Sequence, residues 1–394
     1  MNIKLVLLLL LLVIPLEGLA RIKLITLPVR ERVEIQLDHT SVTLVEEERI
    51  VPLVKGTNQV DFSWANTRID SDSILFRMLP AQSGPEVDAK VLSVSYPPNE
   101  NALVWSVGAD RSGSARVRIS YLLGGLGKSF HYRAVASKDE TSLRLSQFLR
   151  LKNHSNESYD QGQLWVGFGD RMQRPVGLNE TKDLLLKQYP DVQIQKRYTV
   201  DVSEYGYIQA AKKKLKVPMH YVLKNDTANG LGQAALPFGK ARIFQRDGKG
   251  GTTFVGEDWG RFTPRDDEMP LYLGVARDIV VKRTIERRER KKISGNLFNY
   301  NVVVKYEVEN FKDKPVTLDI REQLPRLRSE LGFNSRRDVQ WKLGHDTTLP
   351  GEPDTEKSDA DKVLFHVGLE AREGAAKAKK QTYRLHLVLQ NEWR

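Results

Sequence analysis

Residues 124–129 read GGLGKS, the end of the pattern that holds phosphate groups in many nucleotide-binding proteins. The full pattern, G-x-x-x-x-G-K-[ST], needs a first glycine whose turn lets backbone N–H groups surround the phosphates, and Leu122 stands in its place. Such a loop also leads into a helix, whereas the residues after Ser129, FHYRAVA, continue as a strand-like run. The sequence therefore excludes nucleotide binding and predicts a glycine-rich hairpin connection here.

Other patterns that bring reactive groups together are missing from the sequence. Neither G-x-S-x-G nor S-x-x-K occurs, so no serine has the tight turn or the neighbouring lysine that would activate it. Acidic residues gather at 345–361 without the glycine turn of a calcium loop, at Asp354, Glu356, Asp359 and Asp361. No spacing directs two imidazoles at one metal ion among the histidines His39, His131, His154, His220, His345, His366 and His386. We predict no metal site and no cofactor. Spacing alone leaves open a metal site formed by residues far apart in the sequence, and also a carboxylate pair for glycoside hydrolysis.

A run of basic residues offers chemistry of another kind. Residues 282–292 (KRTIERRERKK) hold seven basic and two acidic side chains. A strand charged on both faces should project from its sheet, and we expect a hairpin that closes at residues 294–296. The candidate contacts for a polyanion are Lys282, Arg283, Arg287, Arg288, Arg290, Lys291 and Lys292, together with Lys212, Lys213 and Lys214. The alternative is a charged sheet edge that resists aggregation, because exposed charges contribute little individually.

Aromatic side chains are a second means of binding a polymer. Trp165, Trp259 and Trp341 are candidates for stacking on sugar rings. The alternative for each is packing in a core or at a sheet edge, which is the common use of tryptophan in a β protein.

Alternation with a period of two dominates the chain and indicates strands with one buried face. It is clearest at residues 300–308 (YNVVVKYEV) and recurs at 116–121 and 383–389. Because such strands need a second layer, we predict an all-β fold of two β-sandwich-like units, mostly antiparallel and with little helix. Hairpins are expected at 247–251 and 312–315, and two helical turns at 181–189. Residues 171–200 and 345–361 do not read as strands, and the second segment is interpreted as a mobile loop.

The first twenty residues predict an export signal. They combine Lys4, an apolar run over residues 5–16, and the small residues Gly18 and Ala20 at the positions that a signal peptidase reads. The alternative, a membrane anchor, would need about 20 apolar residues, and no later segment is apolar enough to span a membrane. We expect a periplasmic protein, in which four Asn-x-Ser/Thr sequons are incidental, at Asn153, Asn156, Asn179 and Asn225.

The composition limits what can stabilise the protein and what it binds. The chain has no cysteine, which excludes disulfides and thiolate chemistry, so stability must come from packing. Its net charge of +11 is compatible with attraction to acidic glycans or lipid head groups. The length of 394 residues suits two domains. We place the first at residues 21–112, after the signal at 1–20, and the second at 113–394.

Several stretches resemble the mucoidy-inhibitor-A-like family of bacterial exported proteins, whose core is a domain of unknown function. They are Tyr121 with residues 124–126 and Tyr132, then 142–170, 236–258, 308–325 and the terminal Trp393-Arg394; residues 27–77 are similar to the β-unit before that core. Lys128 stands where the family has tryptophan, and the coiled coil of many relatives is missing. The resemblance implies the two β-units and provides no catalytic residue.

These observations favour a binding or scaffolding role over catalysis. We predict a non-enzymatic exported envelope protein whose partner is an acidic polysaccharide, an acidic lipid surface or another envelope protein, and not a nucleic acid. The alternatives are a hydrolase of envelope polysaccharide and a subunit of a secretion or adhesion assembly that joins through an open sheet edge.

Overall fold

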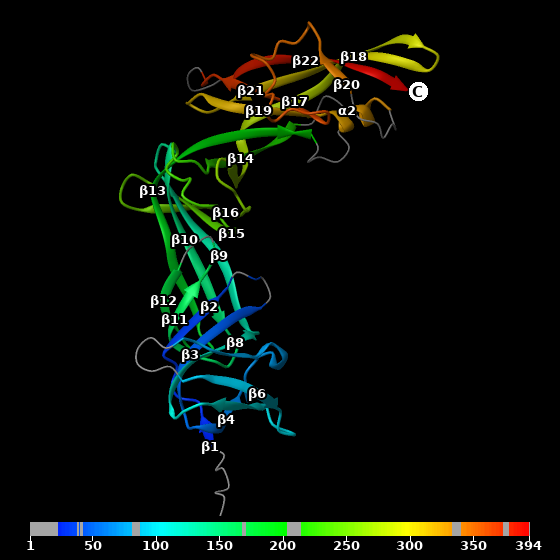
Figure 1. Cartoon of the computed structure of the whole chain (residues 1–394). Helices are drawn as coiled ribbons and strands as arrows, with labels where there is room; N and C mark the ends of the chain where they lie inside the picture. Colours follow the sequence, from blue (N-terminus) through cyan, green and yellow to red (C-terminus); the bar gives the residue numbers. More distant parts are fainter. Residues whose placement is uncertain are drawn as a thin grey trace, which may run out of the picture. The chain divides into compact units, whose positions relative to one another are not determined.

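β-Strands are the main elements of the protein (Figure 1). A computed structural model describes residues 23–37, 39, 42–80, 87–167, 171–202, 214–332, 340–372 and 378–393. Strands account for 66% of the structure and helices for 3%, and the sheets are mostly antiparallel, which confirms the predicted all-β fold. The predicted signal peptide lies outside the described residues. Among those residues, no helix has the length and apolar character needed to cross a membrane.

The chain forms two compact units, and the first comprises residues 1–129 and 149–186. A four-stranded sheet has the order β1 (Lys23–Thr26), β4 (Gly56–Ser63), β7 (Ala102–Ala109), β6 (Ala89–Ser95). A six-stranded sheet has the order β12 (Arg171–Val176), β11 (Tyr159–Trp165), β2 (Arg32–Gln36), β3 (Thr43–Leu53), β8 (Gly113–Leu123), β5 (Leu75–Met78). Aromatic rings join the two sheets, since Trp105 lies 4.6 Å from Phe76 and Phe62 lies 6.0 Å from Tyr121 between ring centroids. This unit is therefore a sandwich, as the alternation at 116–121 predicted.

The second unit comprises residues 130–148 and 187–394 and contains most of a twelve-stranded sheet. Its main path is β16 (Thr252–Gly260), β15 (Gly239–Arg246), β9 (Leu126–Ala136), β10 (Ser142–Asn153), β13 (Thr181–Asp201), β14 (Lys214–Lys224), β17 (Glu268–Ser294), β18 (Leu297–Asn310), β22 (Lys379–Trp393), β20 (Gln340–Leu343). β19 (Val316–Gln323) pairs with β13 and β21 (Lys362–Leu369). Helix α2 (Leu324–Glu330) follows β19.

Two apolar cores stabilise the second unit. One lies between β17, β18 and β22 on one side and β19, β21 and α2 on the other, and includes Tyr306, Val308, Ile320, Phe365 and Leu387. The other joins β9, β10, β13, β14 and β15 with the beginning of β17. The predicted alternation at 300–308 and 383–389 corresponds to β18 and β22, whose apolar residues face the first core.

The division between the units differs from the predicted boundary near residue 112. β8 begins at Gly113, but it pairs with β3 along its whole length and with β5, so it belongs to the N-terminal sandwich. The actual division cuts through β9, β10 and β13. Continuous strands carry no composition change at such a division, which explains why the sequence did not show it.

The predicted hairpin at GGLGKS is not present. β8 lies in the six-stranded sheet and β9 in the twelve-stranded sheet, so Gly124 and Gly125 connect two sheets. Gly125 has φ +80°, and a Cβ atom there would lie 2.7 Å from the carbonyl oxygen of His154. These glycines therefore allow a close approach of two backbones and do not form a phosphate loop.

Other local predictions have mixed outcomes. The turn at Asp247–Gly251 does join an antiparallel pair, β15 and β16. The connection at 312–315 is not a hairpin, because β18 pairs with β17 and β22 while β19 lies in the opposite layer. Residues 181–189, predicted as helical turns, begin the 21-residue strand β13, and most of 171–200 is strand. Pairing with neighbouring strands overrides the weak local preference there.

Candidate functional site

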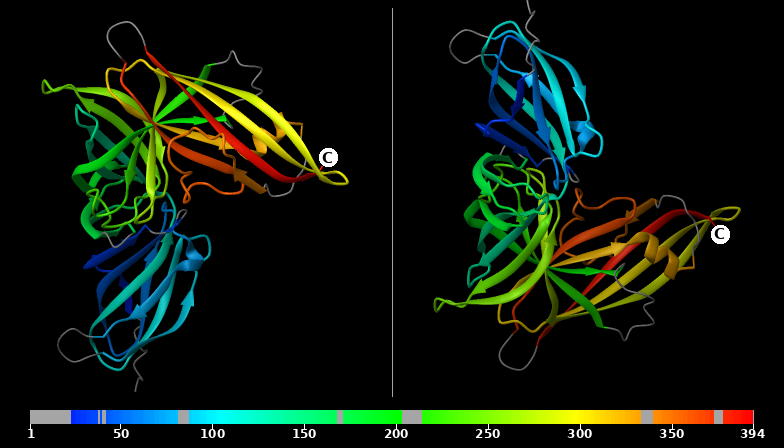
Figure 2. Two further views of the ribbon diagram at one scale, coloured as in Figure 1. Left: turned by 90° about the horizontal axis from the view of Figure 1, so that it is seen from above. Right: turned by 90° about the horizontal axis from the view of Figure 1, so that it is seen from below.

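The basic run lies on a long β-hairpin, as the sequence predicted. β17 has 27 residues, and its pairing with β18 continues to Ser294 and Leu297, so the chain turns at residues 295–296. Leu297 also pairs with Trp393, which places the C-terminal end of β22 beside the turn (Figure 2). The prediction of a hairpin that closes at 294–296 is confirmed.

Two arginines of the run are paired with carboxylates, and one of them, Arg283, is part of the interior. The Arg283 side chain is 3% exposed, and its guanidinium donates to Glu322 at 2.7 and 2.9 Å and to Glu330 at 2.8 Å. Arg287 forms an ion pair with Asp346. Arg283 is therefore removed from the predicted polyanion contacts, because a charge buried here needs its carboxylate partner.

The last cations of the run are exposed. Within the described residues, none of them has an ion-pair partner: Arg288, Arg290, Lys291 and Lys292. In the described part of the chain, Arg290 is the one among them with a ring contact, 5.3 Å from the centroid of Phe298. Their partners on β18 are the uncharged Val302, Tyr300, Asn299 and Phe298. We call these four residues the cationic tip. It concentrates positive charge around one acidic side chain, Glu289.

The remaining predicted cations lie away from the tip. Lys282 is half-buried and pairs in register with Glu307 on β18 and with Lys214 on β14. Lys214 is exposed at the start of β14. Lys212 and Lys213 lie outside the described residues.

The three candidate tryptophans occupy different surroundings. Trp259 is 55% exposed, and its ring is parallel to that of Phe238 at a centroid distance of 5.1 Å. Trp341 is half-buried against the C-terminal core and donates from Nε1 to the carbonyl of Asp359 at 3.1 Å. Trp165 is half-buried and is covered by the guanidinium of Arg171, 3.3 Å from the ring centroid. Only Trp259 among these three presents a largely exposed ring, so it is the one to test for glycan stacking.

A polar cleft lies where β13, β19 and β21 meet. A hollow of about 530 Å³ is lined by Glu140, Lys196, Tyr198, Lys314 and Glu370, among others. It adjoins a second hollow of about 410 Å³, with which it shares Lys196 and Thr317. Glu140 accepts hydrogen bonds from Lys196 at 2.5 Å, from Tyr221 at 2.7 Å and from Lys314 at 3.2 Å. Burial opposes the charged carboxylate, but these contacts outweigh it and lower the pKa of Glu140.

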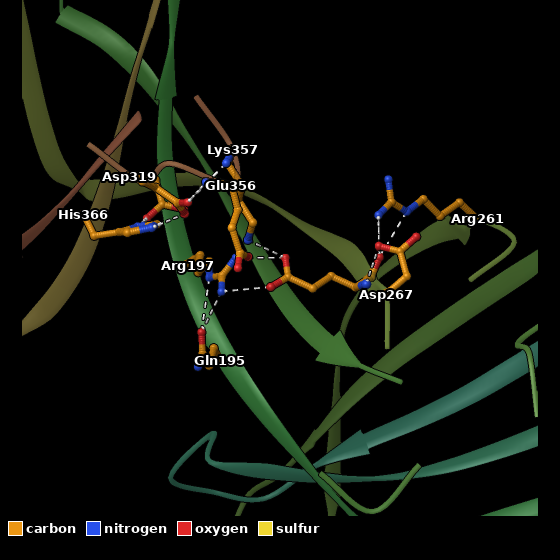
Figure 3. Close-up of polar contacts among 10 residues, drawn as sticks. Gln195, Arg197, Arg261, Asp267, Asp319, Glu356, Lys357 and His366 are labelled. Atoms are coloured by element: carbon orange, nitrogen blue, oxygen red, sulfur yellow. Dashed lines mark hydrogen bonds and ion pairs between the residues drawn. The ribbon is translucent and has the colours of Figure 1, made fainter. Parts of the chain in front are cut away.

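The second hollow contains a histidine held between two carboxylates (Figure 3). His366 Nδ1 lies 2.7 Å from Asp319, its partner in register on β19, and Nε2 lies 3.0 Å from Asp354. Beside it, Glu268 accepts from Arg197 at 3.1 Å and from Lys357 at 2.8 Å. Asp354 and Lys357 therefore attach the acidic segment 345–361 to the sheet. The segment predicted as a mobile loop is therefore held to the sheet by these two side-chain contacts.

We expect this attachment to weaken as the pH rises. Burial disfavours the imidazolium of His366, but its hydrogen bonds to Asp319 and Asp354 dominate and raise its pKa. A pKa raised by folding gives stability that is complete below the unfolded value, about 6.5, and is lost as pH rises through the folded value. The wild type should lose stability relative to His366→Gln as the pH rises above about 6.5, measured by thermal unfolding. If stability depends on pH in the same way in both proteins, His366 is not held in its protonated form by Asp319 and Asp354.

The comparisons with known proteins provide no family. No family model matches the chain, and no curated protein has a detectable similarity to its sequence. The resemblance to the mucoidy-inhibitor-A-like family therefore stays a prediction.

Proposed function

We propose that this is a non-enzymatic, exported cell-envelope protein that binds a polyanionic surface through the cationic tip. The proposal rests on one observation. The four tip cations are exposed and have no ion-pair partner in the described part of the chain. Arg283 and Arg287 on the same strand are neutralised by carboxylates. The expected location rests on the N-terminal sequence, and the resemblance to a family of exported proteins is consistent with it.

Two of the three carboxylates that line the polar cleft, Asp139 and Glu140, lack the property that glycoside hydrolysis needs in its acid. A glycosidase needs a carboxylic acid with a raised pKa beside a second, ionised carboxylate. Hydrogen bonds from Ser137 and Thr141 lower the pKa of Asp139, and the pKa of Glu140 is also lowered. Both groups are therefore ionised at neutral pH, and neither is suited to protonate a leaving group.

The tip combines basic side chains with an exposed apolar one, as protein segments that bind anionic membranes do. Ile293, next to Lys292, is 48% exposed and extends the basic run toward the turn. An apolar side chain among cations can enter the head-group region while the cations bind phosphates. An acidic polysaccharide offers the same negative charge without an apolar layer, so contact with Ile293 distinguishes the two ligands.

The test replaces the four tip cations by serine. Each cation near an anionic surface contributes about 1 kcal/mol, so the variant should bind vesicles of anionic lipid roughly a thousandfold more weakly. Vesicle sedimentation and retention on an immobilised acidic polysaccharide, each at increasing salt, measure the effect. If the ligand is lipid, Ile293→Ser should weaken binding to vesicles and leave retention on the polysaccharide unchanged.

The matched control changes the net charge equally at exposed positions elsewhere. Lys55, Lys90, Arg144 and Lys249 are exposed residues of other strands and turns. The quadruple serine variant at these positions should bind nearly as well as the wild type. If it loses as much binding as the tip variant, the attraction is a property of net charge and the tip has no special role. Cross-linking and co-purification from the envelope would separately reveal a protein partner, as expected for an assembly subunit that joins through an open edge such as β6.

A further inference from the structure

We infer that His345, Asp346 and His386 form a binding site for one divalent transition-metal ion of the zinc class. One ligand atom from each of the three lies within 4.8 Å of the others. His345 Nε2 is 3.1 Å from Asp346 Oδ1, and His386 Nδ1 is 3.7 Å from Asp346 Oδ2. Two ligands bound tetrahedrally at zinc distances are about 3.3 Å apart, so small movements suffice to enclose an ion.

The backbone holds the three residues together. His345 and Asp346 form the turn after β20, and His386 lies on the paired strand β22. The N–H of Gly344 donates to the carbonyl of His386 at 2.8 Å, and the N–H of His386 donates to the Thr347 hydroxyl at 3.1 Å. A Cβ atom on Gly344 would lie 2.2 Å from His386 Nδ1. The glycine therefore lets the turn close over the imidazole.

The imidazole of His386 has unused hydrogen-bonding capacity. The residue is 2% exposed, and within the described residues its Nε2 has no hydrogen-bond partner. Its Nδ1 accepts only a long contact of 3.3 Å from the N–H of Asp346. A metal ion bound at Nδ1, the ring nitrogen nearest to Asp346, would replace this long contact. Because Nε2 has no partner in the described part of the chain, no other hydrogen bond holds the ring against a small movement toward the ion.

The donor set determines which ion fits. Two imidazoles and one carboxylate are ligands that zinc prefers, whereas calcium and magnesium bind oxygen atoms. Arg287 forms its ion pair with Asp346 Oδ2, so Oδ1, next to His345, is available to the ion. Three protein ligands leave a fourth position open to water or to a group from outside.

The experiment uses the full-length protein without a histidine tag, stripped of metal by a chelator. Zinc titration by calorimetry should show one equivalent bound, and cobalt(II) should give a visible spectrum of a four- or five-coordinate ion. His345→Ala and Asp346→Asn should each weaken zinc binding at least about tenfold, because even the loss of an outer partner costs that much. Excess magnesium should not compete.

The matched control is His154→Ala, which removes an exposed histidine from the other unit and should leave zinc binding unchanged. The two site variants change half-buried or exposed side chains and should stay folded, as circular dichroism will show. A protein that binds no stoichiometric zinc overturns the inference. Equal zinc affinity in the wild type and in both site variants would do so as well.

Discussion

Replacing Arg283 by methionine is expected to lower the free energy of unfolding by about 3–5 kcal/mol. Arg283 enters the core between β17 and β19, where Glu322 is fully buried and also accepts the hydroxyl of Tyr306. The substitution leaves the Glu322 carboxylate in an apolar core without its cation, and an unpaired buried charge is costly. Urea unfolding followed by tryptophan fluorescence measures the change.

The matched control lies on the same strand. Arg288→Met makes the same change at an exposed position of the tip and should alter stability by less than about 0.5 kcal/mol. Replacing the whole polar cluster, as Arg283→Met with Glu322→Leu and Tyr306→Phe, should recover most of the loss, because apolar groups of similar size need no partner. Equal effects of the two single substitutions would show that Arg283 does not carry a buried ion pair.

The pattern of the strands was predictable, but the roles of the arginines were not. Alternation at 300–308 identified β18 and its buried face, and the Ser-Gly-Asn turn after the basic run identified the hairpin. The arginines of β17 look alike in the sequence. Arg283 meets its carboxylate 39 residues later, and Arg287 meets Asp346 59 residues later. Only the tertiary structure separates structural cations from the free ones.

The same reasoning explains what the sequence missed at the histidines. His345 and His386 come from a turn and a strand that pair in the sheet, so no short spacing reveals them. The partners of His366 likewise lie on β19 and in the acidic segment. Period-two strands give side-chain direction but not which strand is the neighbour, and long-range pairing brings these groups together.

Asn225→Asp is the second substitution with a large expected effect, about 3–5 kcal/mol of lost stability. Asn225 is 1% exposed at the end of β14, and its Nδ2 donates to the carbonyls of Ala234, Thr263 and Pro264 at 2.9–3.1 Å. Its Oδ1 accepts the N–H of Gly232 at 3.0 Å. Aspartate has the same shape but no donor, so a negative charge would face three carbonyl oxygens.

Asn225 holds the segment directly before β17, so the substitution also tests whether this contact stabilises the first strand of the hairpin. The backbone of Asn225 pairs with Asp266 and Asp267, directly before β17 at Glu268. Hydrogen exchange should therefore increase at the beginning of β17, while the exposed tip changes little. Asn101→Asp, at an exposed position of the other unit, is the control and should cost less than about 0.5 kcal/mol. If both substitutions lower the free energy of unfolding equally, the Asn225 amide does not stabilise the beginning of β17. The apolar residues of the strand would then account for its stability.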